Sequence, residues 1–138
     1  MKYVLFVCVG NSGRSQMAEA FFNHFCSGGY RALSAGTAPA TSVSRTAIAA
    51  MTELGIDIGS QQPKPLTQQT IQQADRIITM GCDVAESCPA GLDPSEDWGL
   101  TDTRGQPLEK VRLIRDQIRE RVLALLTKLG ESYSAETM

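Results

Sequence analysis

The feature that most constrains the fold is a short apolar run, residues 3–7, that leads directly into Cys8 and a glycine-containing loop. The run is rich in β-forming residues, so it predicts a buried strand that ends at Cys8. Apolar residues recur at helical spacing from Met17 onward, which predicts a helix that begins close to Arg14 or Ser15. The chain therefore opens with a strand, a short loop and a helix.

The loop between this strand and this helix has the composition of an anion-binding site. Its glycines let the backbone N–H groups turn toward one point, and such a nest at a helix N-terminus binds tetrahedral anions. Cys8 is expected at the floor of the nest as a nucleophile, where the positive field favours a thiolate. Arg14 is expected to bind two oxygens of the anion as a bidentate fork. The predicted oxyanion-binding residues are Val9, Gly10, Asn11, Ser12, Gly13, Arg14 and Ser15.

The rest of the chain alternates strands with helices. Strands are predicted at residues 30–35 and 76–80, with a fourth near 92–100. Helices are predicted from a cap at Ser42 or Ser44 to residue 54, at residues 67–74 and at residues 107–129. This order predicts one three-layer α/β domain over residues 1–130, in which helices cover both faces of a four-stranded parallel sheet. Residues 131–138 are expected to be a C-terminal tail. Ligands of such sheets bind beyond the carboxyl ends of the strands.

Composition excludes several classes of function. The chain has 138 residues and a net charge of −2, which argues against nucleic acid or an anionic membrane as a partner. No apolar run approaches the roughly 20 residues that span a bilayer, and no signal peptide pattern is present, so we expect a cytoplasmic protein. His24 is the sole histidine, which does not suit a zinc site. It is expected at the surface or at a helix end, and Cys26 in packing; apart from the potassium ion considered below, no metal and no tightly bound cofactor are predicted.

Two further cysteines, Cys82 and Cys88, follow the strand predicted at residues 76–80. In a reducing compartment they are thiols rather than a structural disulfide. In one interpretation, one of these two cysteines is a buried core residue and the other has no specific role. The other is a thiol relay, in which these two and Cys8 pass a disulfide outward. A bond from Cys8 to Cys82 requires Cα atoms within about 7 Å, so local unfolding of residues 82–98 is expected to bring them together.

The motif Cys8, five residues, Arg14 and Ser15 resembles the low-molecular-weight protein tyrosine phosphatase fold. The longer stretch of residues 8–20 is more similar to the thioredoxin-coupled arsenate reductases built on that fold. The Thr-Met-Gly-Cys sequence that ends at Cys82 extends the resemblance, as does the Cys-Pro pair that follows.

This resemblance implies a reduction of arsenate to arsenite. Cys8 attacks the arsenic, Cys82 then attacks the Cys8 sulfur, and Cys88 moves the disulfide to the Cys82–Cys88 pair. Thioredoxin or a related reductant regenerates the thiols. Ser15 is expected to donate a hydrogen bond to the Cys8 thiolate, and Asn11 to hold the shape of the loop. Phosphate and sulfate are expected to compete with arsenate, and the protein to be a monomer.

The resemblance also assigns the general acid to Asp102, with Asp97 as the nearby competitor. Phosphotyrosine phosphatases of this fold place aromatic residues directly after this aspartate, where they flank a phenyl ring. Here Thr103 and Arg104 follow instead, which favours the reductase branch.

Members of the reductase family can bind a potassium ion near the loop. Asn11, Glu19 and Ser34 match parts of that site. The resemblance therefore implies a potassium ion beside the anion loop.

Two other functions stay open at this point. The first is a phosphotyrosine or phosphomonoester phosphatase that uses Cys8, Arg14 and Asp102 and has no need of Cys82 and Cys88. The second is an oxyanion or redox sensor that forms a disulfide without multiple turnover. The phosphatase predicts that Cys82→Ser and Cys88→Ser keep full turnover, and the sensor predicts no multiple turnover with any reductant.

Overall fold

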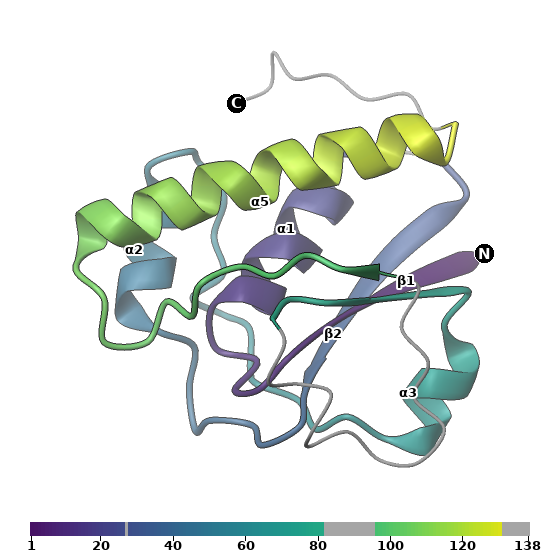
Figure 1. Ribbon diagram of the computed structural model, residues 1–138, viewed down its shortest axis with the longest axis horizontal. Coiled ribbons are helices and arrows are strands. Elements are labelled where there is room, and N and C mark those ends of the chain that lie inside the picture. The colour runs from purple at the N-terminus through teal and green to yellow at the C-terminus, as the bar shows by residue number, and fades with distance from the viewer. Residues whose placement is uncertain (27, 82–95, 131–138) are drawn as a thin grey trace.

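The computed structural model describes residues 1–26, 28–81 and 96–130. The elements in chain order are β1 (Lys2–Cys8), α1 (Arg14–Phe25), β2 (Tyr30–Gly36), α2 (Arg45–Thr52), α3 (Gln68–Gln73), β3 (Arg76–Thr79), β4 (Glu96–Asp97) and α5 (Leu108–Lys128). The four strands form one parallel sheet in the order β2-β1-β3-β4 (Figure 1).

The first strand, β1, lies in the middle of the sheet between β2 and β3. Successive side chains of a strand point to opposite faces, and both faces of β1 are covered. Phe6 and Cys8 belong to the larger of two apolar clusters, and Leu5 and Val7 to the smaller. This double burial explains why the strand reads as an unbroken apolar run rather than as an alternation.

Helices cover both faces of the sheet. Helices α1 and α5 lie over one face with α2 packed against α5, and α3 lies on the other face (Figure 1). One side of α5 is apolar and buried, including Ile114, Ile118 and Val122. The predicted fold class, a three-layer α/β domain with a four-stranded parallel sheet, is confirmed.

Most predicted element ends are close to the observed ones. Thr67 caps α3, because its side chain accepts a hydrogen bond from the Thr70 N–H. Pro107, expected at the first helical position, lies one residue earlier: its ψ of 158° is extended, and α5 begins at Leu108. Strand β4 comprises two residues, so the described part of the predicted 92–100 strand is mostly loop.

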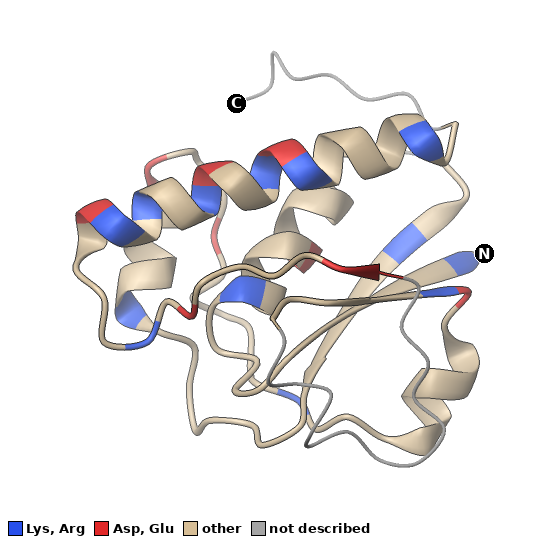
Figure 2. Ribbon diagram, in the orientation of Figure 1, with Lys and Arg blue, Asp and Glu red and all other residues tan. Residues whose placement is uncertain are grey.

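Charged residues of both signs lie along α5 (Figure 2). The buried side of this helix is apolar except for Arg115, which donates to the Ala50 carbonyl and pairs with Glu53 and Asp116. Among the helices that the structure describes, none combines the length and the apolar character that a membrane crossing requires.

Candidate active site

The loop between β1 and α1 is shaped by a neighbouring segment of the chain. The carbonyls of Val9, Gly10 and Ser12 accept hydrogen bonds from the N–H groups of residues 38, 40 and 44, at 2.9, 2.9 and 2.8 Å. With its carbonyls bonded outward, the loop leaves backbone N–H groups available on its inner side. Neither the Gly10 nor the Ser12 N–H donates to another residue in the described part of the chain. Unpaired amides at a helix N-terminus form an anion site.

The Cys8 side chain lies at the start of this loop and is 2 % exposed. The Asn11 N–H donates a hydrogen bond to its Sγ at 3.2 Å, and the Ser15 Oγ lies 2.8 Å from the same atom. The Asn11 Nδ2 donates to that Ser15 oxygen at 2.7 Å, which leaves the hydroxyl proton free to point at Cys8. Two donors directed at one sulfur stabilise a thiolate, the nucleophilic form of cysteine.

Asn11 is the residue that holds the loop together. Its backbone is left-handed, with φ of 48°, a conformation that asparagine tolerates. Its Oδ1 accepts from the Lys64 N–H at 2.8 Å and from the Gln16 Nε2 at 3.1 Å. Because a backbone N–H only donates, Lys64 fixes which end of the amide faces it, and so directs Nδ2 toward Ser15.

Arg14 is 4 % exposed, and its side chain reaches across the carboxyl edge of the sheet. Its Nη1 donates to the Leu100 carbonyl at 2.9 Å and to the Met80 carbonyl at 3.4 Å. A Cβ on Gly81 would lie 2.6 Å from Nη1, so the absence of a side chain there makes room for the guanidinium. The carbonyl bonds use Nη1 only, so Nε and Nη2 are left to form a fork for an oxyanion.

Asp102 lies beside this guanidinium and is half-buried. Its Oδ2 is 3.8 Å from Arg14 Nη2, and Arg104 donates to the carboxylate through Nε at 2.8 Å and its own N–H at 3.0 Å. Burial raises the pKa of Asp102, but the Arg104 hydrogen bonds and the charges of Arg14 and Arg104 outweigh it. The pKa is therefore held below its ordinary value, and Asp102 is ionised near neutral pH.

Gly13 brings the loop into close contact with the segment that follows Asp102. A Cβ on Gly13 would lie 2.1 Å from Thr103 Oγ1 and 3.5 Å from Thr103 Cβ. Thr103 is 1 % exposed, and its hydroxyl has no hydrogen-bond partner among the described residues. Packing between these two residues therefore sets the distance between the anion loop and Asp102.

Replacing Gly13 with alanine should push these two segments apart. We expect the free energy of unfolding to fall by about 1–3 kcal/mol, as for other overpacked buried sites, and phosphate to bind more weakly. Adding Thr103→Ala removes the 2.1 Å contact and leaves the 3.5 Å one, so the double variant should recover both properties. Thermal unfolding measures the stability, and phosphate titration measures the affinity. An equal loss of stability and of phosphate affinity in the single and the double variant would contradict the prediction.

The remaining sequence candidates are placed as follows. Asp97 accepts a hydrogen bond from the Thr79 hydroxyl at 2.8 Å and, within the described ranges, forms no ion pair with Arg14. His24 is exposed at the last turn of α1, as expected, and Cys26 packs against the core. Cys82 and Cys88 lie outside the described residues.

Two residues of this site were not predicted from the sequence. Arg104 stands two positions after Asp102, a spacing from which the ion pair could have been inferred. Lys64 is remote in sequence from Asn11, and nothing in the local pattern points to their contact. No cluster of histidine, cysteine, aspartate and glutamate suited to a metal occurs in residues 1–26, 28–81 and 96–130.

Comparison with known proteins identifies close similarities along nearly the whole chain. The model of the low molecular weight phosphotyrosine protein phosphatase family matches residues 3–135. The chain is 40% identical over 137 residues to a glutaredoxin arsenate reductase of Synechocystis, covering 94% of this chain and 100% of that protein.

Solved structures of similar proteins also match nearly the whole chain. An arsenate reductase in the phosphate binding state is 38% identical, with a TM-score of 0.78 over 93% of this chain and 98% of that one. A thioredoxin-dependent arsenate reductase of Corynebacterium glutamicum is 34% identical, with a TM-score of 0.78 over 94% of this chain and 62% of that one.

Proposed function

The chain belongs to the low molecular weight phosphotyrosine protein phosphatase family, and we propose that within this family it is an arsenate reductase. The observation that carries the chemistry is the Cys8 sulfur, held between two hydrogen-bond donors at the foot of an anion loop. Both branches of the fold share that arrangement. The reductase branch is supported by the arsenate reductases at 34–40% identity and by the pair Cys82 and Cys88, which a phosphatase does not need.

In the first step, arsenate occupies the loop and the Arg14 fork binds two of its oxygens. The Cys8 thiolate attacks arsenic, a sulfur–arsenic bond forms, and an oxygen leaves as water after it receives a proton. Asp102 is the proposed proton donor. It is ionised in the free protein, but a bound oxyanion places a like charge beside it, which raises the pKa of a carboxyl. Binding of arsenate therefore favours the protonated form of Asp102, which can donate the proton.

The second stage is a thiol relay. The Cys82 thiolate attacks the Cys8 sulfur; a disulfide forms, the sulfur–arsenic bond breaks, and its electron pair stays on arsenic, which leaves as arsenite. Cys88 then attacks Cys82 and frees the Cys8 thiolate. The two electrons that reduced arsenic are restored when an external dithiol reduces the Cys82–Cys88 disulfide.

Thioredoxin is the proposed electron donor, supported by the thioredoxin-dependent reductase among the similar structures. Glutaredoxin is the competing donor, because the Synechocystis relative carries that name.

The test is arsenate-dependent NADPH oxidation with thioredoxin and thioredoxin reductase. We expect Cys82→Ser and Cys88→Ser each to lose multiple turnover, because each removes one thiol from the relay. Cys26→Ser is the matched control and should keep full activity, since Cys26 packs at the end of α1.

Other outcomes separate the alternatives. Activity of Cys88→Ser with glutathione and glutaredoxin would indicate a two-cysteine route. Hydrolysis of p-nitrophenyl phosphate that needs only Cys8, without arsenate turnover, would make the protein a phosphatase. A single disulfide per molecule without turnover by either donor would make it a sensor.

A further inference from the structure

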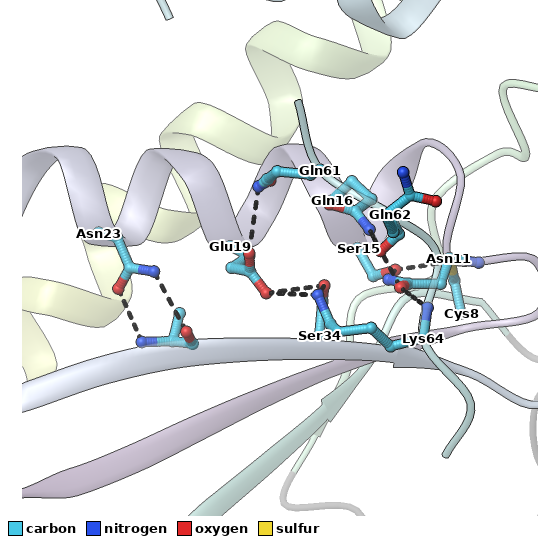
Figure 3. A network of polar contacts seen from close by, with 11 residues as sticks. Cys8, Asn11, Ser15, Gln16, Glu19, Asn23, Ser34, Gln61, Gln62 and Lys64 are labelled. Carbon is cyan, nitrogen blue, oxygen red and sulfur yellow. Dashed lines mark hydrogen bonds and ion pairs between the residues drawn. The ribbon is translucent and has the colours of Figure 1, made fainter. Parts of the chain in front are cut away.

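The ammonium group of Lys64 lies against two side chains outside the loop between β1 and α1. Lys64 Nζ is 3.3 Å from Glu19 Oε1 and 3.4 Å from Ser34 Oγ (Figure 3). Ser34 also donates to Glu19 Oε1 at 2.9 Å, and Gln61 Nε2 donates to Glu19 Oε2 at 3.2 Å. Both oxygens of this carboxylate are therefore bonded, and Lys64 supplies the positive charge that balances it.

Burial makes that charge necessary. The Glu19 side chain is 13% exposed, and Ser34 is 1 % exposed. A carboxylate that is largely removed from water is costly unless a cation pairs with it. The Lys64 side chain is 45% exposed, so its stem reaches inward while part of it stays in water.

The same residue is bonded to the catalytic loop through its backbone. The Lys64 N–H donates to Asn11 Oδ1 at 2.8 Å, and the Lys64 carbonyl accepts from the Gly36 N–H at 2.8 Å. From Asn11 the bonds continue through Ser15 to the Cys8 sulfur (Figure 3). An unbroken series of contacts thus joins the ammonium on Glu19 to the nucleophile.

A potassium ion does not fit this arrangement. Glu19 and Ser34, two of the residues that match the potassium site of the family, are bonded to the Lys64 ammonium, and Asn11 Oδ1 is bonded to the Lys64 and Gln16 N–H groups. An ion at Glu19 and Ser34 would have to displace Lys64 or add a second positive charge beside it. Like charges at that separation repel.

We propose that Lys64 is a built-in cation that replaces a bound monovalent ion and positions Asn11, and through it Ser15 and Cys8. The wild-type protein is therefore indifferent to potassium. Removing the ammonium opens a site of carboxylate and hydroxyl oxygens that potassium can enter. Lys64 acts through other groups and does not touch the reacting atoms, so it is a positioning residue for the proposed reaction.

The test compares Lys64→Ala, which leaves space for an ion, with Lys64→Met, which fills the space without charge. Two properties are measured in potassium chloride and in choline chloride at equal ionic strength. They are the thermal midpoint and the rate of Cys8 alkylation by iodoacetamide, read from the Cys8 peptide by mass spectrometry. Neither depends on arsenate, so failure here is distinct from failure of the proposed function.

In choline chloride, both variants should alkylate Cys8 about tenfold more slowly than wild type, the loss that follows removal of an orienting partner. Potassium should restore the rate of Lys64→Ala and raise its thermal midpoint by ligand linkage, and should not change Lys64→Met. The control Lys110→Ala removes an exposed lysine of α5. Its rate of Cys8 alkylation and its thermal midpoint should equal those of wild type in both salts. Adding Glu19→Gln to Lys64→Ala should abolish the potassium response.

Three results would overturn the proposal. The first is a potassium response of the wild-type protein. The second is a Lys64→Ala variant whose slow alkylation does not recover in potassium, and the third is one that alkylates Cys8 as fast as Lys110→Ala does.

Discussion

Replacing Cys8 with serine is expected to lower arsenate-dependent turnover by about a thousandfold or more, as loss of an enzyme nucleophile does. A serine hydroxyl is not ionised near neutral pH, and the groups bonded to this atom cannot deprotonate it: the Ser15 hydroxyl and the Asn11 N–H are directed at it as donors. These donors stabilise a negative sulfur and do not remove a proton from an oxygen. The measurement is the coupled NADPH assay at saturating arsenate.

The fold should survive this change, because serine is smaller than cysteine and can use the same hydrogen-bond donors. Phosphate should still raise the thermal midpoint of Cys8→Ser, since the amides and Arg14 that bind the anion are intact. Cys26→Ser is the control for loss of a thiol elsewhere in the described chain. Turnover of Cys8→Ser within tenfold of wild type would exclude Cys8 as the nucleophile.

Replacing Arg14 with lysine is expected to lower kcat/KM for arsenate by about a hundredfold to a thousandfold, the cost of losing one oriented donor to an oxyanion. Lysine keeps the charge but not the planar fork. Its three donors also share one nitrogen, so bonds to the Leu100 and Met80 carbonyls would leave one donor for an anion, whereas the guanidinium bonds both carbonyls through Nη1 and keeps Nε and Nη2 for the anion. Phosphate inhibition should weaken together with kcat/KM.

Arg112→Lys is the matched control. Arg112 lies on the outer side of α5, where it binds Glu53 through Nε and Nη2 at distances of 2.6–3.0 Å and is 45% exposed. An exposed pair of this kind contributes little to stability, so both the thermal midpoint and kcat/KM should stay close to wild type. Unchanged phosphate binding by Arg14→Lys would show that the anion is not held by the fork.

Local sequence was sufficient to predict those structural features that depend on residues close together in the chain. The strand, loop and helix at residues 2–25 and the helices that begin near residues 67 and 107 were all predicted, because periodicity and helix start signals act over a few residues. The bounds of the short strand β4 were harder to predict. This strand pairs with β3 at two positions, and no local sequence signal marks where that pairing ends.

The catalytic roles of Cys8, Arg14 and Asp102 stay predictions, but their placement supports them unequally. The motif located Cys8 and Arg14 on its own, since five residues after a strand end leave little choice of position. Asp102 was found only by resemblance. Its ion pairs with Arg14 and Arg104 make it a distinct residue among the loop aspartates that the structure describes.

The sequence by itself therefore determined the parallel sheet and the loop from Cys8 to Arg14, because these follow from hydrophobic periodicity and short-range backbone chemistry. Tertiary structure decided how the loop is held. Leu100 directs Arg14, Thr103 packs on Gly13, and Lys64 orients Asn11, each across dozens of residues. Such contacts depend on which surfaces packing brings together, and no local pattern encodes that.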